Sequence, residues 1–122
     1  MQKIDGTTIL INRGDILNLS ISLVYDDGST YTFKNGDKLV FSLYNKGKMT
    51  DDAVLMKTVT ASGGEESLII NCTNEETKLG DPINKEKEYW YEIELNDEHT
   101  VIGYDEEGAK ILMLYPEGSK ND

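Results

Sequence analysis

The stretch Tyr89-Trp90-Tyr91-Glu92-Ile93-Glu94-Leu95, YWYEIEL in one-letter code, carries the clearest structural signal in the chain. Side chains of an extended segment point to opposite faces in turn, so a period of two separates the residues into two sets. One set is apolar and the other mixes a tryptophan with two carboxylates. The two sets are Tyr89, Tyr91, Ile93 and Leu95, and Trp90, Glu92 and Glu94. This pattern predicts a strand with one buried face.

The same period recurs along the chain. Alternating apolar residues from Leu17 to Tyr25, an Asp27-Gly28 turn signal and a second alternating run predict a β-hairpin over residues 16–33. Further strands are expected at 39–43, 53–60 and 67–71. Thr73 or Asn74 is expected to cap one helical turn that Gly80 ends. Residues 100–104 and 109–115, joined by DEEG, are expected to form a closing hairpin.

These segments define the expected fold class. They amount to about eight or nine short strands, with turn signals at roughly the 8–12-residue spacing of sandwiches and barrels. A chain of 122 residues accommodates one domain with a continuous core. We therefore expect an all-β fold, an antiparallel β-sandwich over residues 1–116. Residues 117–122 are expected to form a flexible tail, because little in them can pack.

Charge restricts the classes of partner. Asp and Glu number 23 against 12 Lys plus Arg, which gives a formal net charge of -11. This charge repels phosphate backbones and anionic lipid surfaces, so we expect no nucleic-acid partner and no membrane partner. A single cysteine and the lack of a signal-peptide core or apolar span favour the cytoplasm of the producing cell.

The tripeptide Arg13-Gly14-Asp15 has the sequence that integrin ligands display as an adhesion signal. Extended segments precede and follow it closely, so only a brief connection remains. Gly14 can adopt positive φ there, and Asp15 can bond nearby backbone amides. An adhesive tripeptide needs a projecting loop tip, so we interpret this one as a corner between strands.

Cys72 and His99 are the only cysteine and histidine, and two lone residues do not make a catalytic motif. Cys72 ends a predicted strand and is expected in or near the core, whereas His99 is expected in a solvated turn. One cysteine and one histidine also fall short of the ligands that zinc requires. We predict no catalytic residue, no metal site and no cofactor.

Carboxylates cluster in several expected turns and could gather calcium, whose preferred ligands are oxygens. Their spacing matches no EF-hand loop, and carboxylates also favour turns and solubility, so we interpret them as solvated turns. Glycoside hydrolysis would need an aromatic-rich cleft signal as well, which is missing. The clusters are Asp26-Asp27, Asp51-Asp52, Asp97-Glu98 and Asp105-Glu106-Glu107.

Trp90 falls on the same face as Glu92 and Glu94, where polar residues predominate. Either a neighbouring loop such as residues 81–87, DPINKEK, covers it, or it contacts a partner, since half-exposed tryptophans often anchor interfaces. The closing strand adds a second signal, because both of its alternating sets are apolar. A small domain has little mass for a third layer, so we expect another subunit to cover Leu112 and Leu114. The resulting interface candidates are Trp90, Leu112, Leu114, Val40 and Tyr44.

The order of these features resembles a family. The segments INRGDILNLSISL, DDGSTYTFKNGDKLVFSL, VLMKTV, TNEETKLG and YWYEIELN, followed by VIG and LYPEG, are similar to small immunoglobulin-like proteins of tailed bacteriophages and prophages. The similarity is greatest to the N-terminal domain of the phage baseplate upper protein. The shared motifs are a Gly14-Asp15 corner, Gly36-Asp37 before an alternating strand, and a Tyr-x-Tyr-Asp-Ile strand that has Glu92 here. Residues 82–87 depart from the compact glycine turn of the family.

The resemblance implies an immunoglobulin-like sandwich, an assembly role and no catalytic residues. The leading hypothesis is a phage or prophage tail component that contacts tail subunits, itself or both, first in the bacterial cytoplasm and then in the virion. A second hypothesis is an acidic inhibitor that mimics nucleic acid and blocks a host enzyme, which only the charge supports. A third is a surface-binding or carbohydrate-binding sandwich, which the seven tyrosines favour.

Overall fold

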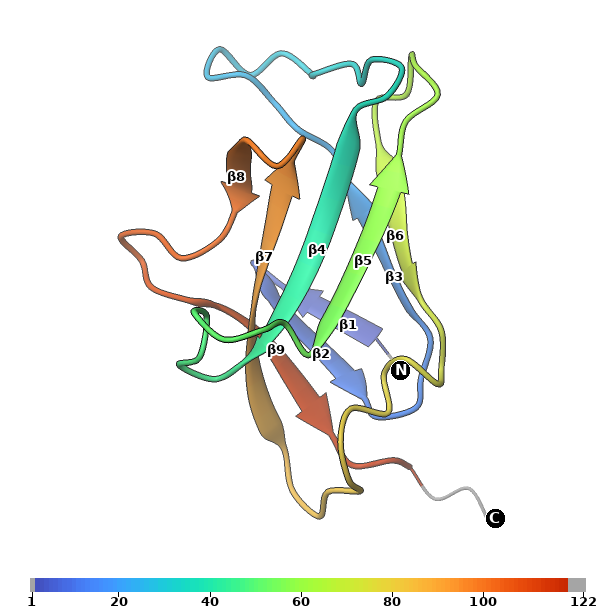
Figure 1. The fold of residues 1–122 in the computed structure, drawn as a ribbon, viewed down its shortest axis with the longest axis vertical. Coiled ribbons are helices and arrows are strands. Elements are labelled where there is room, and N and C mark those ends of the chain that lie inside the picture. Colours follow the sequence, from blue (N-terminus) through green and yellow to red (C-terminus); the bar gives the residue numbers. More distant parts are fainter. Residues whose placement is uncertain (1, 119–122) are drawn as a thin grey trace.

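The computed structural model describes residues 2–118, which form nine β-strands and no helix (Figure 1). The first five strands are β1 (Gln2–Asp5), β2 (Thr8–Asn12), β3 (Leu17–Ile21), β4 (Lys38–Asn45) and β5 (Leu55–Thr60). The other four are β6 (Leu68–Cys72), β7 (Lys87–Leu95), β8 (His99–Ile102) and β9 (Lys110–Tyr115).

The strands form two sheets of very different size. The large sheet has seven strands in the order β1-β2-β9-β7-β4-β5, with β8 also paired to β7, and the small sheet consists of β3 and β6. Apolar side chains from both sheets make one core cluster, so the fold is a β-sandwich. Figure 1 shows the small sheet on the side of the molecule where β5 lies, and β6 contacts β5.

β7 is the central strand of the large sheet. On one edge, β7 pairs with β4 from Tyr89 to Leu95. On the other edge, β9 pairs with the first half of β7 and β8 with the second half, with a register shift at Ile93 and Glu94. Tyr89, Tyr91 and Ile93 are at most 4% exposed, which confirms the buried face predicted from the alternation.

Both expected hairpins pair differently from the prediction. β3 pairs with β6, and residues 22–37 retain only an isolated bridge between Val24 and Thr30. Tyr25, which ends the alternating apolar run that begins at Leu17, is 55% exposed. At the other end of the chain, β8 and β9 both pair with β7, and the DEEG turn gives a single bridge between Asp105 and Gly108. A turn signal determines only where the chain reverses. Which strands then pair depends on the long central strand, because two stretches of its edge are free to accept partner strands.

Two further features were not expected. Residues 2–5 form β1, which pairs antiparallel with β2. β2 in turn pairs parallel with β9, so the sandwich is not purely antiparallel. This pairing places Ile9 and Ile11 opposite Leu112 and Leu114, and all four side chains are core residues.

The Arg13-Gly14-Asp15 tripeptide forms the predicted corner between β2 and β3. Gly14 has a φ of 88°, a left-handed conformation that favours glycine. Arg13 is only 7% exposed and donates to the Gly80 carbonyl at 2.7 Å and to the Glu117 carboxylate. A buried guanidinium cannot reach a receptor cleft. Glu117, the first residue of the segment expected to form a flexible tail, makes this ion pair, and residues 119–122 of that segment lie outside the described part of the chain.

The segment after β6 packs against this corner. Thr73 caps one turn, as its hydroxyl accepts from the Glu76 amide at 3.2 Å and the Glu76 carboxylate accepts from the Thr73 amide at 2.9 Å. The Thr77 hydroxyl accepts from the Gly14 amide at 3.1 Å and donates to the Asp15 carbonyl at 2.8 Å. Gly80 ends the segment with a φ of 64°. The corner, this turn and the segment that follows β9 therefore form one hydrogen-bonded unit.

We expect Arg13→Met to lower the free energy of unfolding by about 2 kcal/mol, because it leaves the Gly80 carbonyl and the Glu117 carboxylate without their cationic donor. Urea unfolding followed by circular dichroism measures this change. Lys78→Met is the matched control, since the exposed Lys78 ammonium only meets Glu75 at 3.3 Å and should change stability by less than about 0.5 kcal/mol. Equal effects of the two substitutions would show that the Arg13 contacts do not hold the corner.

Candidate functional site

The outer face is the side of the large sheet that points away from β3 and β6. Tyr44, Trp90 and Ile111 are directly opposite one another there, on the neighbouring strands β4, β7 and β9. Leu10 and Met113 form the adjoining pair on β2 and β9. Cross-strand neighbours on one face lie within side-chain contact, so these residues make a continuous apolar surface. We define the outer strip as the following set of residues: Leu10, Tyr44, Trp90, Tyr104, Ile111 and Met113.

Trp90 lies in the middle of the outer strip and is half-buried. Its indole N–H donates to the Glu88 carboxylate at 2.8 Å, so its polar atom is satisfied within the chain. Its ring contacts the ring of Tyr104 with centroids 5.8 Å apart, and Tyr104 is itself 62% exposed. The expected covering loop was residues 81–87. The ring contact instead comes from the connection between β8 and β9, which only partly covers the indole.

Gly103 lets the connection between β8 and β9 approach the outer face closely. This glycine is buried, and a Cβ atom built on it would lie 2.6 Å from Thr100 Cγ2 and 3.4 Å from Glu92 Cβ. The first distance is shorter than real side-chain contacts, so a larger residue would displace the chain. The residue that follows Gly103 is Tyr104, and the glycine therefore positions the ring that contacts Trp90.

Two other predicted interface residues, Val40 and Tyr44, also lie on the outer face. They are 6% and 9% exposed, so their neighbours already cover most of their surface. The Tyr44 hydroxyl donates to the Glu92 carboxylate at 3.1 Å. Burial, followed by the nearby Glu92 charge, raises the pKa of Tyr44 above its usual value. Tyr44 lies directly opposite Trp90 and Val40 lies opposite Glu94, and both side chains are nearly buried within the outer face rather than projecting from it.

Leu112 and Leu114 do not belong to the outer strip, which corrects the prediction made for them. They are 2% and 0% exposed and face the small sheet, whereas Ile111 and Met113 occupy the outer face. Lys110 points inward like the two leucines. Its chain is buried, and its ammonium reaches the Asp105 carboxylate at 2.8 Å, so a polar residue begins an inward-facing set.

The outer strip has the composition of an interface core with a polar rim. Trp90, Tyr44, Met113 and Tyr104 belong to residue types enriched in such cores. Further exposed apolar side chains continue the surface at the edge strand β5 and at the end of β9. These are Val54, Met56 and Tyr115, which are 40%, 59% and 37% exposed. Glu88, Glu92 and Glu94 supply carboxylates along β7, so a partner with cationic groups around an apolar centre fits this face.

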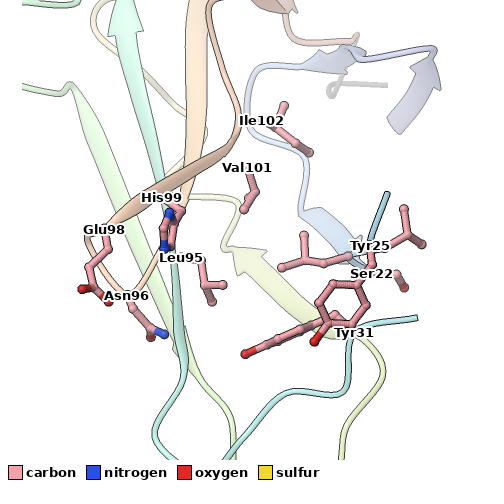
Figure 2. Close-up of a pocket in the computed structure, with 11 residues that line it drawn as sticks. Ser22, Tyr25, Tyr31, Leu95, Asn96, Glu98, His99, Val101 and Ile102 are labelled. Carbon is pink, nitrogen blue, oxygen red and sulfur yellow. The ribbon is translucent and has the colours of Figure 1, made fainter. Parts of the chain in front are cut away.

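A separate pocket of about 580 Å³ lies at one end of the sandwich. Figure 2 shows its two walls: Leu95, Asn96, Glu98 and His99 stand on one side, and Ser22, Tyr25 and Tyr31 stand on the other. The first wall belongs to the β7–β8 turn and the second to the segment after β3. Val101 and Ile102 line the space between the two walls. This volume is within the range of ligand pockets, which is about 300–1,000 Å³.

Asp37 joins the two walls of this pocket. Its carboxylate accepts from the Tyr31 hydroxyl at 2.5 Å, from the Lys34 amide at 2.9 Å and from the Asn96 side-chain amide at 2.9 Å. The bond from Tyr31, followed by those from Lys34 and Asn96, lowers the pKa of Asp37 to about 2. The same bond, together with burial, raises the pKa of Tyr31 to about 12. The pair therefore stays as a carboxylate and a phenol across the neutral range.

We expect Asp37→Asn to destabilise the fold at neutral pH and to lose this effect in acid. The folded-state pKa of Asp37, about 2, lies below its ordinary value of 3.8, so the stabilisation is complete above about pH 4 and disappears as the pH falls toward 2. The measurement is the difference in free energy of unfolding between wild type and variant across this range. Asp52→Asn changes an exposed carboxylate and should shift stability by less than about 0.5 kcal/mol. A difference that stays constant down to pH 2 would contradict the role given to Asp37.

Cys72 and His99 are not brought together. Cys72 pairs with Leu17 and is fully buried, whereas His99 is exposed and lines the pocket that begins at Ser22, beyond the other end of β3. Burial, followed by the nearby Glu76 charge, raises the pKa of the Cys72 thiol to about 11. The neutral thiol is a weak nucleophile, so this cysteine behaves as a small core residue.

Cys72 should therefore not react with Ellman's reagent in the folded protein at about pH 8, because the thiol is both inaccessible and protonated. Full reaction is expected after unfolding in guanidinium. A Ser67→Cys variant carries an exposed thiol next to β6 and serves as the control, with one reactive group in the native state. Rapid labelling of the wild-type protein in native buffer would show that the core around Cys72 opens.

No group of three or more His, Cys, Asp or Glu side chains within residues 2–118 is arranged to hold a metal ion. The described part of the chain also has no helix that could cross a membrane. Comparisons with protein-family models, with curated proteins and with solved structures gave no match to this chain.

Proposed function

We propose that this protein is a non-enzymatic assembly component of a phage or prophage tail or baseplate, and that it docks onto protein partners through the outer strip. The observation that carries the proposal is the half-buried Trp90 between Tyr44 and Ile111, with its indole N–H already bonded to Glu88. Because the polar atom is satisfied within the chain, docking would bury mainly apolar surface and would leave no unpaired donor.

The energetics favour Trp90 as the anchor of such an interface. Tryptophan is enriched among the residues whose truncation costs about 2 kcal/mol or more of binding. Tyr44, directly opposite Trp90 on β4, is nearly buried, and the exposed Tyr104 ring contacts the Trp90 ring from the connection between β8 and β9. The sequence resemblance to immunoglobulin-like tail proteins supports tail subunits as the partners, and a second copy of the chain is the other candidate.

Sedimentation of particles from lysed producer cells tests this proposal. Wild-type protein is expected in the fractions that contain tail-sized particles. Trp90→Lys and Ile111→Lys are expected to leave those fractions, because each places an ammonium in the centre of the apolar surface. Ile69→Lys is the matched control. It introduces the same charge at a residue that is 59% exposed on β6, in the other sheet, and should sediment like the wild type.

Two outcomes would contradict the proposal. One is wild-type protein that stays in the light fractions at every stage of infection or induction. The other is an Ile69→Lys variant that leaves the particles together with Trp90→Lys, which would show that the outer strip is not the docking surface. Sedimentation with a single host enzyme would instead favour the acidic-inhibitor hypothesis.

A further inference from the structure

The small sheet has only two strands, and β3 is one of its edges. β6 pairs with one side of β3, and no other strand within residues 2–118 pairs with its second side. The Gln2 side chain does occupy one position there. Its amide N–H donates to the Asn18 carbonyl at 2.7 Å, and its oxygen accepts from the Asn18 amide at 2.8 Å. A side-chain amide is thus bonded to β3 in the way that a peptide group of a neighbouring strand would be.

The backbone groups that follow Asn18 on this edge are open. In an antiparallel pair, alternate residues direct their N–H and C=O groups to opposite sides. Asn18 is bonded to Gln2 on the free side, so Ser20 and Ser22 direct their groups to that side as well. Leu23 belongs to the other set, and its carbonyl accepts from the Tyr31 amide at 2.8 Å. Among the described residues, Ser22 takes part in none of the backbone bonds outside the strand ladders.

Two cavities follow this edge one after the other. The first, of about 170 Å³, is lined by Ser20 and Ile21 of β3, by Ile4 of β1 and by Ile102 of β8. The second is the pocket of Figure 2, which continues with Ser22, Leu23 and Val24 and shares Ile102. Core side chains such as Leu19, Ile93 and Tyr91 line the inner end of the first cavity. The edge of β3 therefore borders an apolar groove that leads from β1 to the β7–β8 turn.

We propose that this groove accepts an extended segment of a partner protein, which adds a third strand to the small sheet beside β3. Open N–H and C=O groups at a two-residue period match a strand, and they match neither a helix nor a compact ligand. Alternate apolar side chains of the segment would enter the groove at Ile21 and Ile102. Main-chain bonds at Ser20 and Ser22 would continue the row that the Gln2 amide begins.

Charge indicates the chemistry of that segment. Glu98 lines the groove at one end, the exposed Asp26 and Asp27 form the adjoining turn, and the exposed Asp5 follows Ile4 at the other end. A second copy of this chain would bring its own net charge of -11 to the same place. The favoured occupant is therefore a strand with alternating apolar residues and lysine or arginine at its ends.

The test uses the fluorescein-labelled peptide Lys-Thr-Val-Thr-Val-Thr-Val-Lys and the wild-type protein. Main-chain bonds supply most of the affinity in strand addition, so the probe need not copy the natural sequence. We expect a dissociation constant below about 1 mM by fluorescence polarisation, and weaker binding in high salt. In amide NMR spectra, the largest changes should occur at Ser20, Ser22 and Ile102, with slower hydrogen exchange at the two serines.

Two matched peptides carry N-methyl groups on either the valines or the threonines. Only one edge of the added strand can face β3, so one of these peptides should bind about tenfold more weakly while the other is less affected. A peptide with glutamate in place of both lysines should also bind more weakly. Ser20→Pro, which removes an N–H on the free side of an edge strand, should weaken the parent peptide by about tenfold without unfolding the sheet.

The proposal is overturned if the parent peptide gives no spectral change up to millimolar concentration. It is also overturned if the changes lie at the β5 edge or on the outer strip, or if both methylated peptides bind as well as the parent. Trp90→Lys should retain peptide binding, because the groove and the outer strip lie on different surfaces. Peptide binding by the Trp90→Lys variant therefore distinguishes failure of the groove proposal from failure of the proposed assembly function.

Discussion

The alternation of β7 is the constraint on which the rest of the structure depends. Tyr89, Tyr91 and Ile93 must face the small sheet, so Trp90 and its neighbouring carboxylates must face outward. β7 is also long enough to pair with β4 on one edge and with both β8 and β9 on the other. Its register with β9 sets the inward phase of Leu112 and Leu114 and brings β2 into the sheet beside β9. A slip of one residue in β7 would move the core set to the solvent and Trp90 into the core.

Much of the fold could be predicted from the sequence, because strands with one buried face follow a period of two. The strands at residues 39–43, 67–71 and 89–95 were correctly expected, and so was the corner at Gly14 with its left-handed conformation. Which strands pair with one another could not be predicted from this period. A turn such as DEEG reverses the chain, but whether the two flanking strands then pair depends on free edges elsewhere in the sheet. The orientation of β9 was predicted wrongly because both of its alternating sets are apolar, so the alternation alone does not show which set faces the core.

The candidate surfaces differ in how far the sequence could indicate them. Trp90 was singled out because its orientation opposed that of the core residues, and Val40 and Tyr44, named with it as interface candidates, share its face but are nearly buried. Ile111 was not predicted as a surface residue because the orientation of β9 was predicted wrongly. Tyr104 was not predicted because it lies in the connection between β8 and β9, whose path depends on Gly103. The groove beside β3 rests on backbone groups of Ser20 and Ser22, and their direction depends on which strand takes the other side. Sequence alternation assigns side chains to faces, but it does not show which edges of a sheet remain open.

Arg13 is the only arginine in the chain, and its side chain is buried in the corner that joins the segments around Gly80 and Glu117. An arginine-specific protease therefore has a single peptide bond to attack, Arg13–Gly14, and that bond is accessible only when the corner opens. Cleavage at this bond occurs only in molecules whose corner is open. When the corner recloses faster than the protease cuts, the cleavage rate reports the equilibrium between the closed and open corner. Proteolysis at this single bond therefore measures the opening of the corner around Arg13 without any added label.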